Sequence, residues 1–235
     1  MIEDLLPTHV RWAEAFGDPA DATLLPEEEV LVAHVVPERR RECTTVRHLA
    51  RQALAGLGRS PLPLLRGEQG APLWPDGVVG SMTHCRGYRA AVVAERDRVA
   101  SVGIDAEPHG PLPEGVLDVV SLPGERDQLA ALRRQDPSVN WDCLLFSAKE
   151  AVYKTWYPLT GAWLDFSDAR LTLRREDRSF HAQVFATGLA EARTAGVAEA
   201  RIPREFSGRW AVRKGLVVTA IAATAVSAPA ERSPA

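Results

Sequence analysis

Two carboxylates stand two positions apart at the end of a strand-like segment, where Asp105 and Glu107 follow an apolar run. Residues i and i+2 of a strand point to the same face, so the two side chains repel each other. A bound cation relieves that repulsion, and magnesium takes oxygen ligands together with waters and substrate phosphates. Taken alone, the pair is also typical of a solvated strand end. The metal hypothesis therefore depends on further residues.

A second charged pair lies in a strong helical pattern, where Glu150 and Lys154 are four positions apart and share a face. Surface helices carry such pairs routinely as solvated salt bridges. Here the neighbouring residues Phe146, Ala151 and Val152 are apolar. This indicates that the segment is packed on several sides and that its charges face a site.

A polar segment nearer the N-terminus offers groups that suit a small anion. Gly80-Ser81-Met82-Thr83-His84 is predicted to end a strand in a turn, with hydroxyls, backbone N–H groups and an imidazole at one edge. Thr83 could instead be a turn former, and His84 a structural residue. An earlier helix carries a basic stripe that is either an anion-binding face or an exposed surface, formed by Arg40, Arg47 and Arg51.

The elements that must position these residues follow from apolar periodicity. A helix is predicted after Pro37, with apolar side chains at helical spacing over residues 43–57 before Gly58 ends it. Residues 59–76 are rich in proline and glycine and are predicted to form a loop. Three strands are predicted next, at residues 77–82, 88–94 and 99–105.

The second half of the chain repeats this order. Residues 110–113 are predicted as a linker, and residues 117–132 as helical with an interruption at Pro123-Gly124. A stronger helix is predicted over residues 139–156, ending before Pro158 because proline cannot donate the helical hydrogen bond. The remaining pattern predicts strands at residues 169–174, 180–185, 209–212 and 216–222.

A long helix and a run of strands thus occur twice, which predicts two similar α+β halves although no residue-level repeat accompanies the order. We expect residues 1–110 to form the N-terminal half. Residues 111–226 are expected to form the C-terminal half with the helix that carries Glu150. Residues 227–235 are rich in alanine, proline and serine and are expected to be a disordered tail.

Composition limits the classes of function. The chain has 235 residues, 46% hydrophobic and 25% charged, and a net charge of −3 that gives no basic field for nucleic acid. The acidic N-terminus is unlike a signal peptide, and no run reaches the roughly 20 apolar residues of a membrane span. We therefore expect a cytoplasmic protein without a membrane partner. Reduced structural thiols are indicated by the spacing of Cys43, Cys85 and Cys143.

Four segments, taken in order, resemble motifs of the Sfp-type 4′-phosphopantetheinyl transferases, particularly of the branch associated with enterobactin synthase. They span the chain from about residue 40 to residue 157, whereas the last third is similar to the family only in its strand-rich character. The segments are Arg66-Gly67-Glu68-Gln69-Gly70-Ala71-Pro72 with Trp74-Pro75, Gly80-Ser81-Met82-Thr83-His84, Val102-Gly103-Ile104-Asp105-Ala106-Glu107, and Phe146-Ser147-Ala148-Lys149-Glu150 with Lys154. Departures from commoner versions of the motifs, none of which removes a ligand, are Cys85, Ala106 and Phe146.

The resemblance implies an α+β fold, a monomeric pseudodimer of two similar halves, each with a long helix packed on an antiparallel sheet and the active site in the cleft between them. It implies transfer of the 4′-phosphopantetheine arm of coenzyme A to a serine of an apo peptidyl or acyl carrier protein of secondary-metabolite synthases, leaving 3′,5′-ADP. Magnesium, with manganese as an alternative, would be bound with the pyrophosphate of coenzyme A by Asp105, Glu107 and Glu150.

The resemblance also implies a set of residues around the nucleotide. His84 with Thr83 would contact the 3′-phosphate or its surroundings. Arg47 or Arg51 would assist them, and residues 70–72 would border the nucleotide. The whole set expected to bind coenzyme A is Arg40, Arg47, Arg51, Arg66, Gly70, Ala71, Pro72, Thr83, His84 and Lys154.

The catalytic set expected from the resemblance is Asp105, Glu150 and Lys154. Cleavage of a pyrophosphate builds charge on the leaving 3′,5′-ADP, which magnesium and Lys154 would stabilise. The acceptor serine needs a base to take its proton. Glu150 is the first candidate for that base, and Glu125 the second.

Two other functions use the same residues. A different magnesium-dependent nucleotide or phosphoryl transferase would need the carboxylates but no surface for a folded protein acceptor. A non-catalytic carrier-binding protein would be free to lose Asp105, Glu150 or Lys154, all of which are present.

Overall fold

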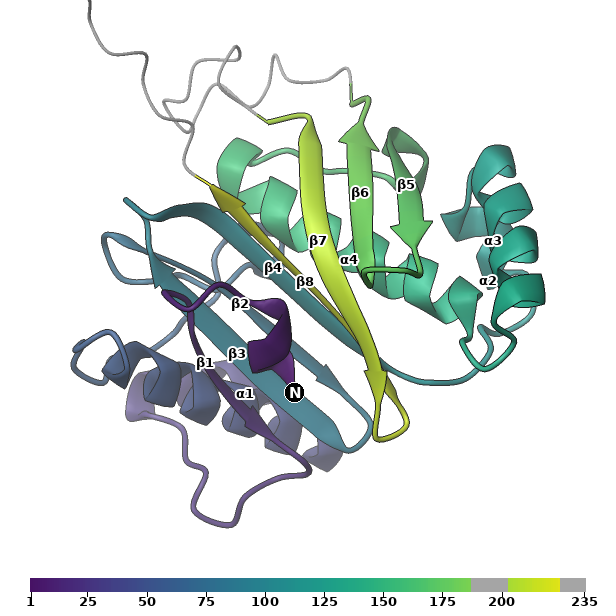
Figure 1. Cartoon of the computed structure of the whole chain (residues 1–235). Coiled ribbons are helices and arrows are strands. Elements are labelled where there is room, and N and C mark those ends of the chain that lie inside the picture. Colours follow the sequence, from purple (N-terminus) through teal and green to yellow (C-terminus); the bar gives the residue numbers. More distant parts are fainter. Residues whose placement is uncertain (187–202, 225–235) are drawn as a thin grey trace, which may run out of the picture.

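The computed structural model describes residues 1–186 and 203–224, and the tail expected at residues 227–235 lies outside this range. Two antiparallel sheets carry the fold, one of three strands and one of five. A long helix packs against each sheet (Figure 1). The expected α+β class, with a long helix on an antiparallel sheet in each half, is confirmed.

The N-terminal half is built on the strands β1 (Arg11–Ala15), β3 (Tyr88–Glu95) and β2 (Val78–Cys85), in that order across the sheet. The helix α1 (Pro37–Ala55) packs on this sheet through a small apolar core, because its apolar residues fall on one stripe. The strand β1 was not predicted from the sequence. The prediction that β2 ends in a turn after Met82 was also wrong, since this strand includes Thr83 and His84 and continues to Cys85, which pairs with Tyr88.

The C-terminal half is built on a five-stranded sheet in the order β4-β8-β7-β6-β5. The strands are β4 (Val99–Pro108), β5 (Ala169–Arg174), β6 (Ser179–Val184), β7 (Glu205–Arg213) and β8 (Leu216–Thr224). The helix α4 (Trp141–Thr160) packs against it with a core that includes Trp141, Trp156 and Phe180. Burial of such large side chains is the main stabilising contribution of this half.

The helix α4 extends beyond its expected end, because Pro158 lies inside its last turn. Proline there removes a single helical hydrogen bond close to a terminus where bonds are already missing. The helix then ends at Gly161, whose backbone is left-handed with φ of 66°. The expectation that α4 would end before Pro158 was therefore wrong.

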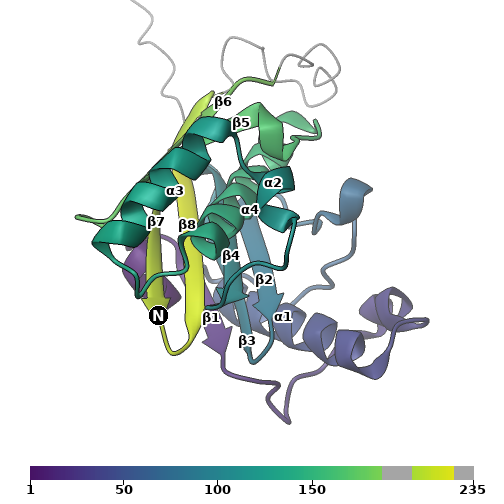
Figure 2. The same ribbon diagram turned by 90° about the vertical axis from the view of Figure 1, so that its right-hand side faces the viewer.

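Two shorter helices, α2 (Val116–Val120) and α3 (Pro123–Gln135), flank α4 (Figure 2). The break between them lies at Ser121 and Leu122, just before the expected interruption at Pro123-Gly124. Pro123 instead begins α3, and the Glu125 carboxylate accepts a hydrogen bond from the backbone N–H of Leu122. Short 3-10 helices complete the fold: η1 (Ile2–Leu5), η2 (Pro26–Val32), η3 (Glu68–Gly70) and η4 (Phe166–Asp168). Within the described ranges, no helix has both the length and the apolar character to cross a bilayer.

The strand β4 joins the two halves. It precedes residue 110, yet it forms a full ladder with β8 in the C-terminal sheet, with Asp105 opposite Thr219. On its other side it lies beside β2 of the N-terminal sheet. The residues of β4 therefore face both halves of the molecule.

Candidate active site

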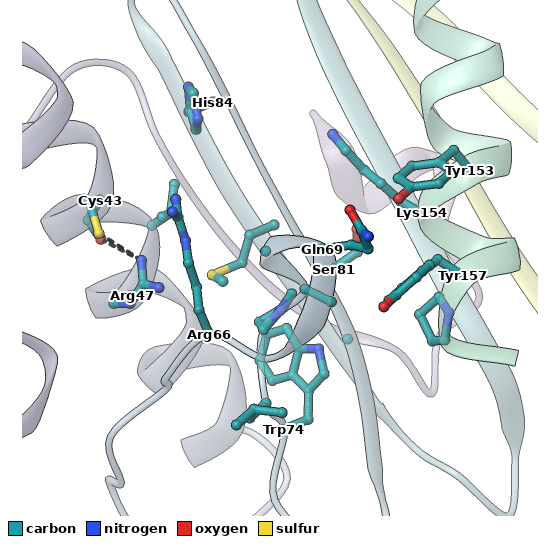
Figure 3. A pocket seen from close by; sticks show the side chains of 18 of the residues that line it. Cys43, Arg47, Arg66, Gln69, Trp74, Ser81, His84, Tyr153, Lys154 and Tyr157 are labelled. Atoms are coloured by element: carbon teal, nitrogen blue, oxygen red, sulfur yellow. Dashed lines mark hydrogen bonds between the residues drawn. The ribbon is translucent and has the colours of Figure 1, made fainter. Parts of the chain in front are cut away.

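A cavity of about 490 Å³ lies between α1, the segment of residues 66–74, β2 and the C-terminal part of α4. Arg47 and Arg66 stand on one side, and Tyr153, Lys154 and Tyr157 of α4 stand on the other (Figure 3). Of the residues expected around coenzyme A or in catalysis, the cavity is lined by Arg47, Arg66, Gly70, Ala71, Pro72, His84, Glu150 and Lys154.

Arg47, on the same side of the cavity as Arg66, is held in place by hydrogen bonds. Its side chain is 4% exposed, its Nε donates to the carbonyl oxygen of Leu64 at 2.9 Å, and one terminal nitrogen contacts the Cys43 sulfur at 2.8 Å. An arginine keeps its charge even where burial lowers its pKa, as it does here. The contact with Leu64 therefore fixes a positive charge beside the cavity.

Arg39 also lines the cavity, although it is not among the residues expected from the sequence. Its guanidinium is 3.1 Å from a Glu42 carboxylate oxygen and contacts the ring of His84. The signal that could have found it is the spacing of Arg39, Cys43 and Arg47, which repeats every four residues on one helix face.

His84 lies at the same wall. Its Nδ1 is 3.4 Å from the Glu42 carboxylate. Burial and the neighbouring Arg39 lower the pKa of His84 to about 4. At neutral pH its ring is therefore uncharged and can offer one N–H to a ligand.

Arg40, Arg51 and Thr83 are not among the described residues that line the cavity. Arg51 donates two hydrogen bonds to the Glu28 carboxylate, at 2.9 and 2.7 Å, and Glu28 is completely buried. Arg40 instead forms an exposed pair with Glu29. The structure thus separates the expected basic stripe into one surface residue, one structural residue and Arg47.

Thr83 is 3% exposed and turns toward β4. Its hydroxyl oxygen accepts a hydrogen bond from the backbone N–H of Ala106 at 3.2 Å and lies 3.3 Å from the Asp105 carboxylate. It therefore contacts a carboxylate of the opposite half and not the cavity.

Of the three expected metal ligands, Glu150 is among the described residues that line the cavity, whereas Asp105 and Glu107 are not. Asp105 is 4% exposed, and its Oδ1 accepts a hydrogen bond from the Lys154 ammonium at 2.7 Å. Its Oδ2 is buried and has no hydrogen-bond partner among the described residues. A buried carboxylate oxygen without a partner carries a high desolvation cost, which a cation would relieve.

Glu107 and Glu150 lie close enough to Asp105 to feel its charge. Burial, followed by the charge of Asp105, raises the pKa of Glu107 to about 7. Burial and Asp105 also raise the pKa of Glu150, although Lys154 opposes the shift. Buried carboxylates that repel one another are stabilised by a cation bound between them.

Across residues 1–186 and 203–224, no three His, Cys, Asp or Glu side chains are already arranged closely enough to hold a metal ion. The donor chemistry nevertheless suits a hard cation, because all three side chains offer oxygen and one buried oxygen of Asp105 lacks a partner. The residues thus fit such an ion by type and charge.

Glu125, the second candidate for the base, has a structural role instead. It is 2% exposed, pairs with Lys149 at 2.8 Å, and accepts a hydrogen bond from the backbone N–H of Leu171 at 2.7 Å. A carboxylate whose oxygens are all engaged inside the core cannot reach a substrate hydroxyl. The suggestion that Glu125 acts as a base was therefore wrong.

Comparison with known proteins agrees with this geometry. Residues 27–94 match the model of the 4′-phosphopantetheinyl transferase N-terminal domain, and residues 101–198 match that of the 4′-phosphopantetheinyl transferase superfamily. The chain is 52% identical to the 4′-phosphopantetheinyl transferase Svp of Streptomyces mobaraensis, over 99% of this chain and 93% of the relative. The chain belongs to the 4′-phosphopantetheinyl transferase superfamily.

Further 4′-phosphopantetheinyl transferases place it within the superfamily. PptT of Mycobacterium tuberculosis is 48% identical, over 94% of this chain and 97% of that protein. Enterobactin synthase component D of Salmonella typhi is 30% identical, over 79% of this chain and 73% of that protein. The superfamily expected from the sequence is confirmed, and the enterobactin-associated relatives are more distant than the other two. Members of the superfamily use coenzyme A as the donor of the 4′-phosphopantetheine arm.

Proposed function

We propose that this chain transfers the 4′-phosphopantetheine arm of coenzyme A to a serine of apo peptidyl and acyl carrier proteins, giving holo carrier and 3′,5′-ADP. One observation carries the proposal above all. A single cavity has arginines from α1 and the 66–74 segment on one wall and Glu150 with Lys154 on the other. A ligand with phosphates at both ends of its nucleotide suits that arrangement.

In this proposal the N-terminal half binds the nucleotide. Arg39, Arg47 and Arg66 supply positive charge for its phosphates, and His84 donates one hydrogen bond. Gly70, Ala71 and Pro72, which line the cavity, would border the nucleotide. Arg40, Arg51 and Thr83 are left out of the binding set because their partners lie elsewhere.

The C-terminal half supplies the chemistry. Asp105, Glu107 and Glu150 would hold magnesium, or manganese, which when bound neutralises charge on the pyrophosphate. Lys154 lines the cavity and contacts Asp105, so its ammonium stabilises charge on the leaving phosphate. Glu150 is the proposed base for the serine hydroxyl, because it lines the cavity beside Lys154 and burial raises its pKa above the ordinary value, which makes it a better proton acceptor.

The carriers proposed as partners are those of non-ribosomal peptide and polyketide synthesis, and the protein is proposed to act as a monomer in the cytoplasm. The same residues would serve another magnesium-dependent nucleotide transferase, which would leave the carrier unmodified.

Intact mass spectrometry of an apo carrier protein after incubation with this protein, coenzyme A and magnesium tests the proposal. We expect a gain of roughly 340 Da that EDTA prevents. Asp105→Asn should lose the gain while keeping its fold, whereas Asp127→Asn, on the exposed side of α3, should retain it. Absence of the gain on several peptidyl and acyl carriers, from folded protein, would reject the transfer and favour a nucleotide transferase or a non-catalytic carrier-binding protein.

A further inference from the structure

The strands β2 and β4 run side by side without sharing a sheet ladder in the described part of the chain. Two side-chain hydroxyls of β2 take the place of ladder acceptors. Ser81 Oγ accepts from the backbone N–H of Ile104 at 3.1 Å, and Thr83 Oγ1 accepts from that of Ala106 at 3.2 Å. Both residue numbers rise together across the pair, so the strands are parallel. We call these two contacts the hydroxyl seam.

Thr83 differs from Ser81 by a second contact. A backbone N–H can only donate, so the bond from Ala106 occupies a lone pair of the Thr83 oxygen and leaves the hydroxyl hydrogen free. The Asp105 Oδ1 atom lies 3.3 Å from that oxygen and can accept the hydrogen. The Thr83 hydroxyl is therefore held by two groups of β4, the backbone N–H of Ala106 and the Asp105 carboxylate.

The two donors on Asp105 select one of its oxygens. Thr83 and the Lys154 ammonium both bind Oδ1, whereas Oδ2 is buried without a partner among the described residues. A carboxylate held through one oxygen has its rotation restricted, and the other oxygen points in a defined direction. Hydrogen bonds of this kind to metal ligands raise metal affinity by orienting the ligand.

We propose that Thr83 is a positioning residue that turns Asp105 so that Oδ2 is presented to the divalent cation, and that it is not a nucleotide contact. This inference rests on the proposed function, because it assigns a role toward the cation bound there. Thr83 is 3% exposed and is not among the described residues that line the cavity, while its neighbour His84 is. In this inference β2 contributes to two parts of the site, with His84 toward coenzyme A and Thr83 toward the metal ligand Asp105.

Three variants separate this role from a general contribution of the seam. Thr83→Val removes the hydroxyl at nearly constant volume, Thr83→Ser keeps it, and Ser81→Ala breaks the other contact of the seam without touching Asp105. Because Ser81 also lines the cavity, manganese binding is compared at coenzyme A concentrations that saturate each variant. Manganese binding is measured by electron paramagnetic resonance in the presence of coenzyme A, coenzyme A binding by calorimetry without metal, and thermal unfolding alongside both. Wild-type transfer to a carrier is measured in parallel.

We expect Thr83→Val to weaken manganese binding by about tenfold to a hundredfold, with coenzyme A affinity in the absence of metal unchanged. Thr83→Ser should bind manganese as the wild type does. Ser81→Ala should lower the unfolding temperature as Thr83→Val does while keeping manganese affinity. If Thr83→Val does not fold, Thr83→Ala replaces it with the same expectations.

Two results would overturn the inference. One is an unchanged manganese affinity in Thr83→Val together with weaker coenzyme A binding, which would make Thr83 a nucleotide contact. The other is an equal loss of manganese affinity in Thr83→Val and Ser81→Ala, which would assign the effect to the seam. Failure of the wild type itself to modify a carrier would reject the proposed function instead, and is read from a separate measurement.

Discussion

The two walls of the cavity are held in different ways. On the N-terminal side, Arg47 donates to the Leu64 carbonyl, the Leu64 N–H donates to Glu28, and Glu28 pairs with Arg51. On the C-terminal side, α4 rests directly on β4 at Gly103, where an added Cβ would come within 2.8 Å of the Thr155 nitrogen. A substitution that removes a buried charge should therefore disturb the N-terminal wall. A substitution that adds a methyl group at Gly103 should disturb the C-terminal wall.

The largest expected effect comes from the buried charge. Glu28→Ala leaves the Arg51 guanidinium and the Leu64 N–H without their partner and should lower the free energy of unfolding by about 3–5 kcal/mol, measured in urea. The matched variant Glu29→Ala breaks only an exposed pair with Arg40 and should cost less than about 1 kcal/mol. Equal losses in the two variants would mean that the N-terminal wall does not depend on the buried pair.

Overpacking of the C-terminal wall should come next. Gly103→Ala forces α4 away from β4 and should lower the free energy of unfolding by about 1–3 kcal/mol. Transfer to the carrier should fall more than coenzyme A binding, because Asp105 and Glu150 lie on the two elements that separate. Gly110→Ala is the control, since nothing lies within 4 Å of its added Cβ. A Gly103→Ala protein with normal stability and turnover would contradict the close contact.

Removal of Lys154 should affect the chemical step. Lys154→Met deletes the ammonium that contacts Asp105 and faces the cavity, and kcat should fall by about tenfold to a hundredfold. The dissociation constant of coenzyme A, measured by calorimetry, should change much less. A change confined to that dissociation constant would make Lys154 an ordinary binding residue.

Removal of Arg66 should weaken coenzyme A binding and leave the chemical step nearly unchanged. Arg66→Met deletes a positive charge from the N-terminal wall and should raise KM for coenzyme A by about tenfold with kcat nearly unchanged. Steady-state kinetics with a single carrier protein measure both constants. A fall in kcat of the same size would contradict the proposal that the N-terminal wall binds the nucleotide and the C-terminal wall carries out the chemistry.

The smallest effect concerns protonation of His84, whose pKa in the free protein is about 4 because of burial and Arg39. A group with a lowered pKa binds its proton less readily in the fold than in the unfolded chain, so its contribution opposes folding as the pH falls below about 6.5. Coenzyme A brings negative charge to the ring and should raise this pKa. Proton NMR titration with and without coenzyme A measures the shift, with His84→Asn to assign the signal. An unchanged pKa on binding would place the phosphates away from His84.

The sequence predicted the acidic and basic residues of α4 and β4 because their periodicity places them on one face of each element. It did not predict which arginines of α1 reach the cavity. Arg51 is held by Glu28, which lies in η2 and is distant in sequence, whereas Arg39 lines the cavity. The role of Thr83 likewise could not be predicted from the neighbouring sequence, because the partners of its hydroxyl belong to β4.

The strand β1 and the full length of β2 were missed for a similar reason. β1 has five residues, and its burial pattern is irregular, so alternation gave no signal. In β2, Ser81, Thr83 and His84 have the polar character of a turn, yet the ladder with β3 runs on to Cys85. The polar side chains of this strand are satisfied by β4 and by the cavity residues, which a local pattern does not contain.

The placement of β4 has a consequence for dividing the chain into fragments. A cut at residue 110 would leave the C-terminal fragment without the strand that pairs with β8, and would expose the β8 edge to aggregation. A cut in the turn between β3 and β4, at residues 96–98, leaves both sheets complete. Two fragments made there meet through the hydroxyl seam, so restored transfer would report their reassembly.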